Sequence, residues 1–440
     1  MASEAPTETA VQHTALARRL SEIRVGFEPA FWVANISELF ERLAYYAAFS
    51  SLANYLHEAL GFSTEQTGSL TGFFGGLVWF LAIAGGALAD RLGFRRALSL
   101  AYLILTIAYF LLSSIGSAWM APVRHAIPLW WIVLVILMLP ALGISMVKPC
   151  VVGTTARTSK ENVRSIGYSI YYTLVNVGGA AGPYVASIAH RHIGVRNVFR
   201  ISAASVLLMF VAVLLLFREP RRSGNTRTVS LRETARNFLT VASNPRFMIF
   251  LIIFSGYWVA YWQEFIGLPL YIHSYINPHA DVELILITDA TSVVFLQILI
   301  SHLTRKIPPF RAVVLGSLVS ALAWLIVGAH AAVWAAVASI FVVALGEMIQ
   351  APRYYEYVGQ LAPPGQQGTY MGFAFVPIGV GSLVGGPIGG ALIHHFGEVE
   401  HQPQRFWWAI VAVGVATTLC LWAYDRIVKP SGTTERHKEI

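Results

Sequence analysis

Apolar residues recur along this chain in long runs separated by short polar loops. Twelve runs are long enough, at about 20 residues, to cross the hydrocarbon core of a bilayer as helices. None of them alternates apolar and polar side chains over its length, as the strands of a membrane barrel would. The pattern predicts an all-α membrane protein whose spans are 29–56, 66–89, 97–118, 128–151, 165–188, 197–217, 246–272, 283–303, 311–329, 331–351, 369–395 and 406–424.

The longest polar stretch between two runs divides the spans into six and six. It predicts an N-terminal tail, a first bundle, a central loop, a second bundle and a C-terminal tail, at 1–28, 29–217, 218–245, 246–424 and 425–440. The halves also echo each other weakly, because NVGGAAGP in the fifth run resembles GVGSLVGGP in the eleventh. Repeated halves with a binding site between them are typical of secondary transporters. The same glycines would also suit close helix packing.

Composition and charge exclude other classes of protein. Only 12% of the residues are charged and 56% are hydrophobic, which is too little charge for a soluble surface. The net charge of +8 sits in short loops, so it does not indicate nucleic-acid binding. Of the 31 Lys and Arg, 23 fall on the side of the N-terminus and 5 on the other side, which predicts that both tails and the central loop are cytoplasmic in a bacterial-type inner membrane. Cys150 and Cys420 lie in apolar runs and indicate neither a disulfide framework nor a metal site, and no cofactor is expected.

The loop after the second run reads GALADRLGFRR over residues 86–96. An ordinary turn with cytoplasmic positive charge is one explanation for it. The full spacing resembles the loop signature of the major facilitator superfamily, which implies a conformational gating motif. The residues of that motif are Gly86, Asp90, Arg91, Gly93, Arg95 and Arg96.

The first run carries the most informative side chains. Their spacing of i, i+3, i+4, i+7 and i+8 places them on one helical stripe. They are Glu38, Glu41, Arg42, Tyr45 and Tyr46. Charges at membrane depth are costly unless they pair or face water. The stripe is therefore either a salt bridge that locks helices together or a site where protonation of a glutamate releases the arginine.

Three motifs resemble the proton-dependent oligopeptide transporter family. The stripe matches ExxERFxYY with Leu43 in place of Phe, GISMVKP at 143–149 is similar to the fourth-helix GxGxxKP segment, and YYTLVNVGG at 171–179 is similar to the fifth-helix signature. The resemblance implies that Glu38, Glu41, Arg42 and Lys148 couple transport to protons. A lysine that snorkels to the interface is the alternative for Lys148.

The resemblance also implies substrate-binding residues in both halves. The second half is more divergent. Trp79 in the second run and Phe373 in the eleventh stand where the family has Tyr and Trp, and Asp289 in the eighth lies near the place of a missing Asn-Pro pair. Glu356 has a simpler explanation as an i, i+3 partner of Arg353. The expected substrate residues are Tyr45, Tyr46, Trp79, Asn176, Trp262, Gln263, Glu264, Asp289, Glu347, Glu356 and Phe373.

These features predict a secondary active transporter of the major facilitator fold with twelve spans and a central cavity. We expect proton-coupled symport of small peptides or a related zwitterionic or anionic solute by alternating access. The alternative is a proton-driven exporter of drugs or metabolites on the same fold. An enzyme is not expected, because the intramembrane charges are spread over five spans instead of grouped as a nucleophile, base and orienter. The expected partners are a small-molecule substrate, protons and the lipid bilayer, with the monomer as the functional unit and no nucleic acid.

Overall fold

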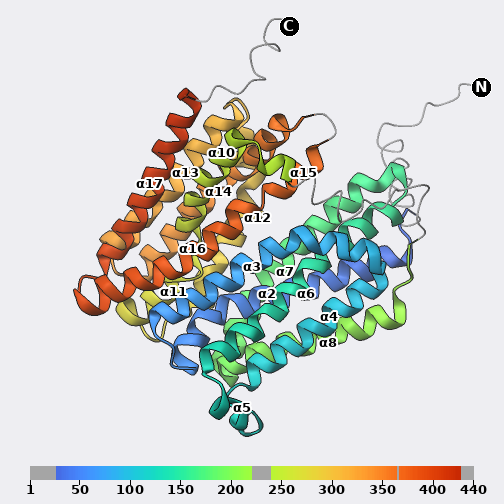
Figure 1. Ribbon diagram of the computed structural model, residues 1–440, viewed down its shortest axis with the longest axis horizontal. Helices are drawn as coiled ribbons and strands as arrows, with labels where there is room; N and C mark the ends of the chain where they lie inside the picture. The colour runs from blue at the N-terminus through green and yellow to red at the C-terminus, as the bar shows by residue number, and fades with distance from the viewer. Residues whose placement is uncertain (1–25, 221–238, 364–365, 428–440) are drawn as a thin grey trace, which may run out of the picture.

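The computed structural model describes residues 26–220, 239–363 and 366–427, and these residues are almost entirely helical. The predicted central loop falls largely, and both predicted tails almost wholly, outside the described residues. The all-α prediction is confirmed. Short loops connect the long helices, so that successive helices run in opposite directions across the molecule (Figure 1).

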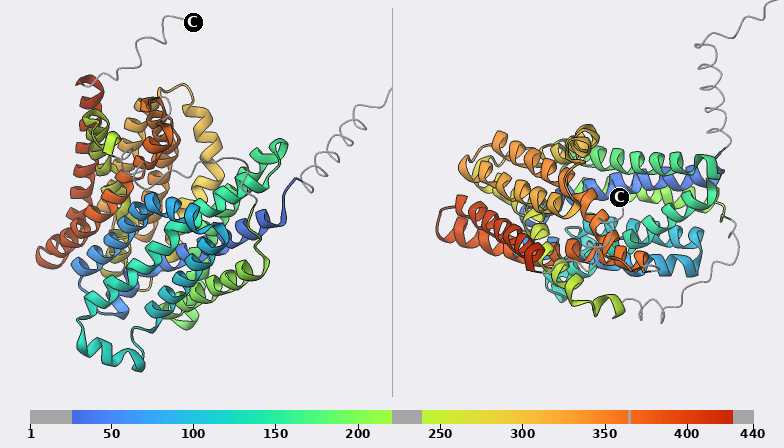
Figure 2. Two further views of the ribbon diagram at one scale, coloured as in Figure 1. Left: turned by 45° about the vertical axis from the view of Figure 1, so that its right-hand side comes forward. Right: turned by 90° about the horizontal axis from the view of Figure 1, so that it is seen from above.

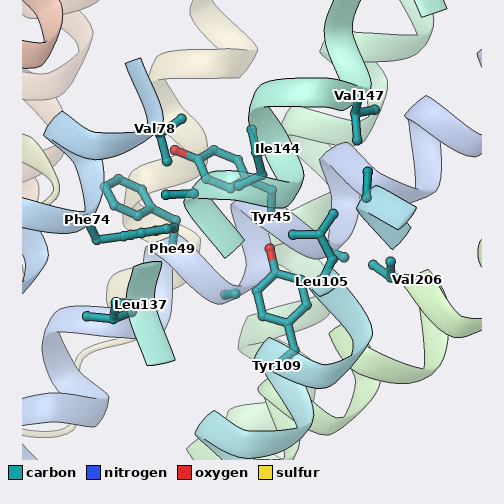
Figure 3. Close-up of a cluster of buried hydrophobic side chains, with 14 of the residues drawn as sticks. Tyr45, Phe49, Phe74, Val78, Leu105, Tyr109, Leu137, Ile144, Val147 and Val206 are labelled. Atoms are coloured by element: carbon teal, nitrogen blue, oxygen red, sulfur yellow. The ribbon is translucent and has the colours of Figure 1, made fainter. Parts of the chain in front are cut away.

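The first half of the chain forms six long helices. A short helix, α5 (Ala121–Ala126), lies between the third and the fourth. The six are α2 (Pro29–Asn54), α3 (Thr64–Leu92), α4 (Phe94–Ser114), α6 (Leu129–Thr158), α7 (Arg164–Ile193) and α8 (Val195–Leu216). Their core is a cluster of aromatic and aliphatic side chains, in which Tyr45 stacks on Phe49 and Phe49 contacts Phe74 (Figure 3).

The second half also forms six long segments, two of them interrupted. The seventh segment consists of α10 (Pro245–Tyr261), a 3-10 turn at Trp262–Glu264, α11 (Gly267–Tyr271) and a π-turn at Ile272–Ile276. The eleventh consists of α15 (Gln367–Phe373), α16 (Val376–Ile393) and a π-turn at His394–Val399. The uninterrupted helices are α12 (Val282–Thr304), α13 (Pro309–Ala329), α14 (Val333–Leu361) and α17 (Gln404–Ile427).

Nine of these segments are apolar and long enough to cross a membrane by composition alone. The other three long helices are α2, α3 and α7. In α2 the charged stripe lowers the hydropathy, whereas α3 and α7 are rich in Gly, Ser and Thr. All three contact the other half of the chain, which gives polar and small residues on these helices protein neighbours at that interface.

The two bundles meet most closely at one end of the molecule. We call it the Gly61 end, after the glycine between α2 and α3, and we call the opposite end the Gly93 end, after the glycine between α3 and α4. Both glycines have positive φ angles, which suits tight turns between antiparallel helices. The first and last described residues lie at the Gly93 end, and further views show the same division into two bundles (Figure 2).

Small residues bring α3 against α16 at this contact. A Cβ atom on Gly72 would lie 2.6 Å from the Ser382 carbonyl oxygen, and one on Gly386 would lie 2.6 Å from the Cα of Gly72. Ser382 also donates a hydrogen bond to the Gly72 carbonyl, at 3.1 Å. In the fifth helix, Gly178 lies equally close to the backbone of α2. Glycines of both echoed segments therefore allow helix backbones to approach closely.

Candidate functional site

The charged stripe of α2 forms a compact ion cluster. Glu38 and Glu41 are 1% and 0% exposed. The Nε atom of Arg42 lies 2.6 Å from a Glu41 oxygen and 3.6 Å from a Glu38 oxygen. One guanidinium therefore serves two buried carboxylates, and the cluster carries one negative charge in excess when both are ionised. A proton or a second cation nearby would remove that excess.

Lys148 is the nearest candidate for the second cation. It lies on α6, directly before Pro149, and interacts electrostatically with both Glu38 and Arg42. Its side chain is exposed, and its Nζ atom lies 5.7 Å from the ring centre of Phe375 in the other half. Among the described residues, no carboxylate comes within 4.0 Å of it. The ammonium group is thus accessible and faces the region between the halves.

Three carboxylates occupy the facing part of the second half. The Tyr261 hydroxyl donates to Glu347 at 3.1 Å and also contacts Asp289. Glu264, at the 3-10 turn, is 0% exposed, and neither of its oxygens has a hydrogen-bond partner. The three groups interact with one another electrostatically. In the described part of the chain, no Arg, Lys or His nitrogen lies within 4.0 Å of any of them.

Tyr46 connects the two charged groups. It lies on α2 and interacts electrostatically with Arg42 and Glu41 on its own helix. It also interacts with Asp289 on α12 and Glu347 on α14. The arrangement therefore places two cations of the first half opposite three carboxylates of the second.

Phe373 does not lie in this region. It is 2% exposed and packs against Phe247 in the core of the second half. Phe375 takes the position instead, stacked on Trp79 at 5.5 Å between ring centres. The break between α15 and α16 falls after Phe373 and changes which side chain faces inward. Sequence reasoning missed Phe375 because it assumed an unbroken helix there.

Several other expected substrate residues are engaged within the protein. Gln263 is fully buried and donates to the carbonyls of Val259 and Gly385, and Trp262 donates to the Ile378 carbonyl. These bonds tie the 3-10 turn to α16.

Two further side chains make local bonds. Asn176 donates to the Tyr172 carbonyl one turn earlier in α7. Glu356 is exposed and forms an ion pair with Arg353 at 2.7 Å, which is the simpler explanation given for it above. The stacked position of Tyr45 likewise places it in the hydrophobic core of the first half.

The predicted gating loop forms the sharp turn between α3 and α4. Gly93 has a φ of 79°, and the Glu219 carboxylate accepts hydrogen bonds from the backbone N–H groups of Phe94 and Arg95 at 2.9 and 2.7 Å. Arg95 in turn donates to the Leu214 carbonyl at the end of α8. The side chain of Asp90 lies outside the described ones. Glu219 was not predicted, because nothing in the sequence links it to a loop more than a hundred residues earlier.

Polar contacts between the halves gather at the Gly61 end and were also not predicted. Glu283 of α12 is 2% exposed and accepts hydrogen bonds from Ser51 and His190, both at 2.8 Å. Asp281 pairs with Arg191, and Glu58 pairs with His273. These pairs hold the two bundles together on the side of the molecule away from the gating loop.

Comparisons with known proteins agree with this architecture. The profile described as Major Facilitator Superfamily matches residues 35–278 and 277–439. Multidrug resistance protein MdtH of Klebsiella pneumoniae is 24% identical over 385 residues, which are 86% of this chain and 90% of that protein. The uncharacterized MFS-type transporter YttB of Bacillus subtilis is 25% identical over 394 residues, with 88% and 92% covered.

Solved structures share the fold at lower identity. A POT family transporter in complex with 5-aminolevulinic acid superposes with a TM-score of 0.74 at 18% identity, covering 91% of this chain and 96% of that one. An auto-inhibited POT family peptide transporter superposes with a TM-score of 0.73 at 16% identity, covering 92% and 98%. These relatives and neighbours are transporters, in agreement with the expectation that the chain is not an enzyme.

Proposed function

Because the chain belongs to the major facilitator superfamily of membrane transporters, we propose that it is a proton-coupled symporter of small peptides or related zwitterionic or anionic solutes. It would work by alternating access between two bundles, at 29–217 and 246–424, joined by the loop 218–245. The fold neighbours include a POT family transporter in complex with 5-aminolevulinic acid and an auto-inhibited POT family peptide transporter, and both support this substrate class.

The observation that carries the proposal is the separation of charge between the halves. Arg42 and Lys148 stand on the first half, and Glu264, Asp289 and Glu347 stand on the second. Attraction between opposite charges is strong in a region with few waters, so a zwitterion would align with its carboxylate toward the first half and its ammonium toward the second. A neutral or uniformly apolar solute would gain nothing from this arrangement.

The ion cluster of α2 would supply the coupling. Arg42 is held by Glu41 and Glu38, so the addition of a proton to either glutamate weakens its hold on the guanidinium. Arg42 or Lys148 then becomes available to a substrate carboxylate. A change of about 1.4 kcal/mol in the balance between two conformations already shifts their ratio about tenfold.

Orientation follows from the charge bias of the loops. We place the Gly93 end and both tails in the cytoplasm of a bacterial-type inner membrane, with the monomer as the transporting unit. The contacts at the Gly61 end then correspond to a state that is closed toward the outside. A Ser223→Cys variant, in the central loop outside the described residues, should resist a membrane-impermeant thiol reagent in intact cells. Labelling there would reverse the orientation.

The test of coupling uses protein reconstituted in liposomes with an imposed pH gradient and labelled Ala-Ala. Glu41→Gln imitates the protonated carboxyl, so it should abolish accumulation driven by the gradient while counterflow exchange continues. Glu400→Gln, which removes a half-buried carboxylate paired with Arg405, is the matched control. If Glu38→Gln, Glu41→Gln and the double variant all accumulate Ala-Ala like the wild type, the cluster is only a structural lock.

Export is the second candidate, because one of the sequence relatives is a multidrug resistance protein. Uptake into two kinds of vesicle distinguishes the two modes. An acidic exterior drives a symporter to accumulate Ala-Ala inside. In inverted membrane vesicles an acidic interior instead drives an antiporter to take up a lipophilic cationic dye. Dye uptake without peptide accumulation would favour export.

A further inference from the structure

We propose that Asp289 and Glu347 each receive a cationic group of the same solute, so that the transporter selects solutes with two amino or guanidino groups and one carboxylate. A dipeptide with a basic side chain has this composition. The inference rests on the proposed function for the role of the first half, which would hold the carboxylate. It goes further in assigning a second cation subsite to the second half.

The first argument is a count of hydrogen-bond donors. A tyrosine hydroxyl has a single proton to donate. Tyr261 contacts both Glu347 and Asp289, so only one of them can receive that proton at a time. The Oδ1 atom of Asp289 has no hydrogen-bond partner at all in the described structure. Polar groups of this kind are expensive to leave unpaired, and a ligand ammonium supplies several N–H donors.

The second argument concerns a third carboxylate, Glu264, beside these two. Glu264 is fully buried, has both oxygens unpartnered and interacts electrostatically with Asp289 and Glu347. A solute cannot touch it directly, because no part of it is exposed. Asp289 and Glu347 are only partly buried, so they lie nearer to the accessible space than Glu264, although the Oδ1 atom of Asp289 is itself buried. The negative charge of Glu264 then increases the attraction of Asp289 and Glu347 for positive charge without touching the solute.

The third argument is the aromatic surroundings. Trp258 meets Tyr261 edge to face at 5.0 Å and Tyr257 at 5.3 Å. Tyr257 also interacts with Glu347 and Asp289. Aromatic rings attract organic cations, more so where water is scarce. Rings beside carboxylates suit an ammonium or guanidinium carried on an organic solute better than a hydrated metal ion.

The charge balance explains why two cationic groups are expected. In the first half, the charges of Arg42 and Lys148 balance those of Glu38 and Glu41, so this group of four side chains is neutral. The second half has three carboxylates and, among its described residues, no cation close to them. A solute with one ammonium would leave one of the two partly buried carboxylates uncompensated, whereas a solute with two would pair with both. Protons on Asp289 and Glu347 are the rival explanation.

The test measures binding of matched dipeptides to the purified full-length protein by calorimetry. Ala-Lys and Ala-norleucine have similar side-chain lengths and differ by one ammonium, and 1,5-diaminopentane carries two ammonium groups without a carboxylate. We expect the wild type to bind Ala-Lys at least about tenfold more tightly than Ala-norleucine, which corresponds to about 1.4 kcal/mol. Asp289→Asn keeps the shape of the side chain and should reduce that ratio to below about threefold. Glu400→Gln should retain the wild-type ratio.

The outcomes separate this inference from the proposed function. If both peptides bind with equal affinity to the wild type, or if Asp289→Asn leaves the ratio unchanged, the second cation subsite does not exist although peptide binding stands. If neither peptide binds but diaminopentane does, in a manner lost in Asp289→Asn, the subsite stands and the peptide substrate is wrong. Failure of all three probes to bind overturns both.

Discussion

Gly386→Ala tests the idea that the contact between α3 and α16 holds the Gly61 end closed. A Cβ at this position would lie 2.6 Å from the Cα of Gly72, whereas ordinary contacts are 3.4–4 Å, and the carbonyl of Gly68 is also too close. Both obstacles are backbone atoms that cannot rotate away. The helices must therefore move apart by about 1 Å, which is an overpacking strain of about 1–3 kcal/mol.

This strain exists only when the two halves touch, so it should shift the population of conformations without unfolding either bundle. A cost of 1–3 kcal/mol corresponds to a change of about 5- to 150-fold in the ratio of closed to open forms. This ratio can be measured by double electron–electron resonance, from the distance between spin labels on His192→Cys and His279→Cys in a Cys420→Ser background. These two sites are exposed and lie on opposite halves at the Gly61 end.

The matched control is Gly372→Ala. A Cβ there meets nothing within 4 Å, so the distance distribution should equal that of the wild type. If Gly386→Ala also leaves the distribution unchanged, the close approach of α3 and α16 does not govern closure. The reasoning would be equally refuted if both variants opened the Gly61 end to the same degree.

Three further predictions concern other residues described above. His190 follows the predicted span 165–188. Its hydrogen bond to Glu283 raises its pKa above 6.5, although burial acts in the opposite direction. The charges of Glu58 and Asp281 raise this pKa further. The closed form then binds more protons than the open form. The same spin labels should therefore report closure below about pH 6.5 and opening as the pH rises through the raised pKa of His190. In His190→Gln this response to pH should be flatter. Glu219→Gln should lower the melting temperature by weakening the cap on α4, a loss of about 1 kcal/mol, whereas the exposed Glu161→Gln should not. Phe375→Leu should weaken Ala-Ala binding with little change in melting temperature. Phe373→Leu removes volume from the core and should lower the melting temperature instead. The opposite result would place Phe373 in the binding region.

Local patterns in the sequence predicted the helices and the α2 cluster well. The i, i+4 spacing of Glu38 and Arg42 predicts their ion pair from helical geometry alone, whereas the shorter Glu41–Arg42 contact joins adjacent residues that this spacing rule does not pair. Glycine positions likewise predicted close packing, although not which helix each would meet.

Contacts between distant segments could not be predicted in this way. Glu283 meets His190 across 93 positions of sequence, and Glu219 caps a helix that begins 125 positions earlier. No periodicity connects such pairs, since they depend on how the bundles fold together. The exchange of Phe373 for Phe375 has a different cause, because a break of two residues between α15 and α16 rotates the faces of the helix.

The interruption of the seventh segment provides a hinge between two rigid portions. α10 is packed within the second half, whereas the far portion carries His273, which is bonded to Glu58 of the first half. The 3-10 turn at Trp262–Glu264 lies between these two portions, where the regular helical ladder is interrupted and bending is easiest. If the first half moves away and displaces the far portion, the change in angle between α10 and α11 would be concentrated at this turn. The buried Glu264 lies in the turn, so a change in its charge would alter that angle directly.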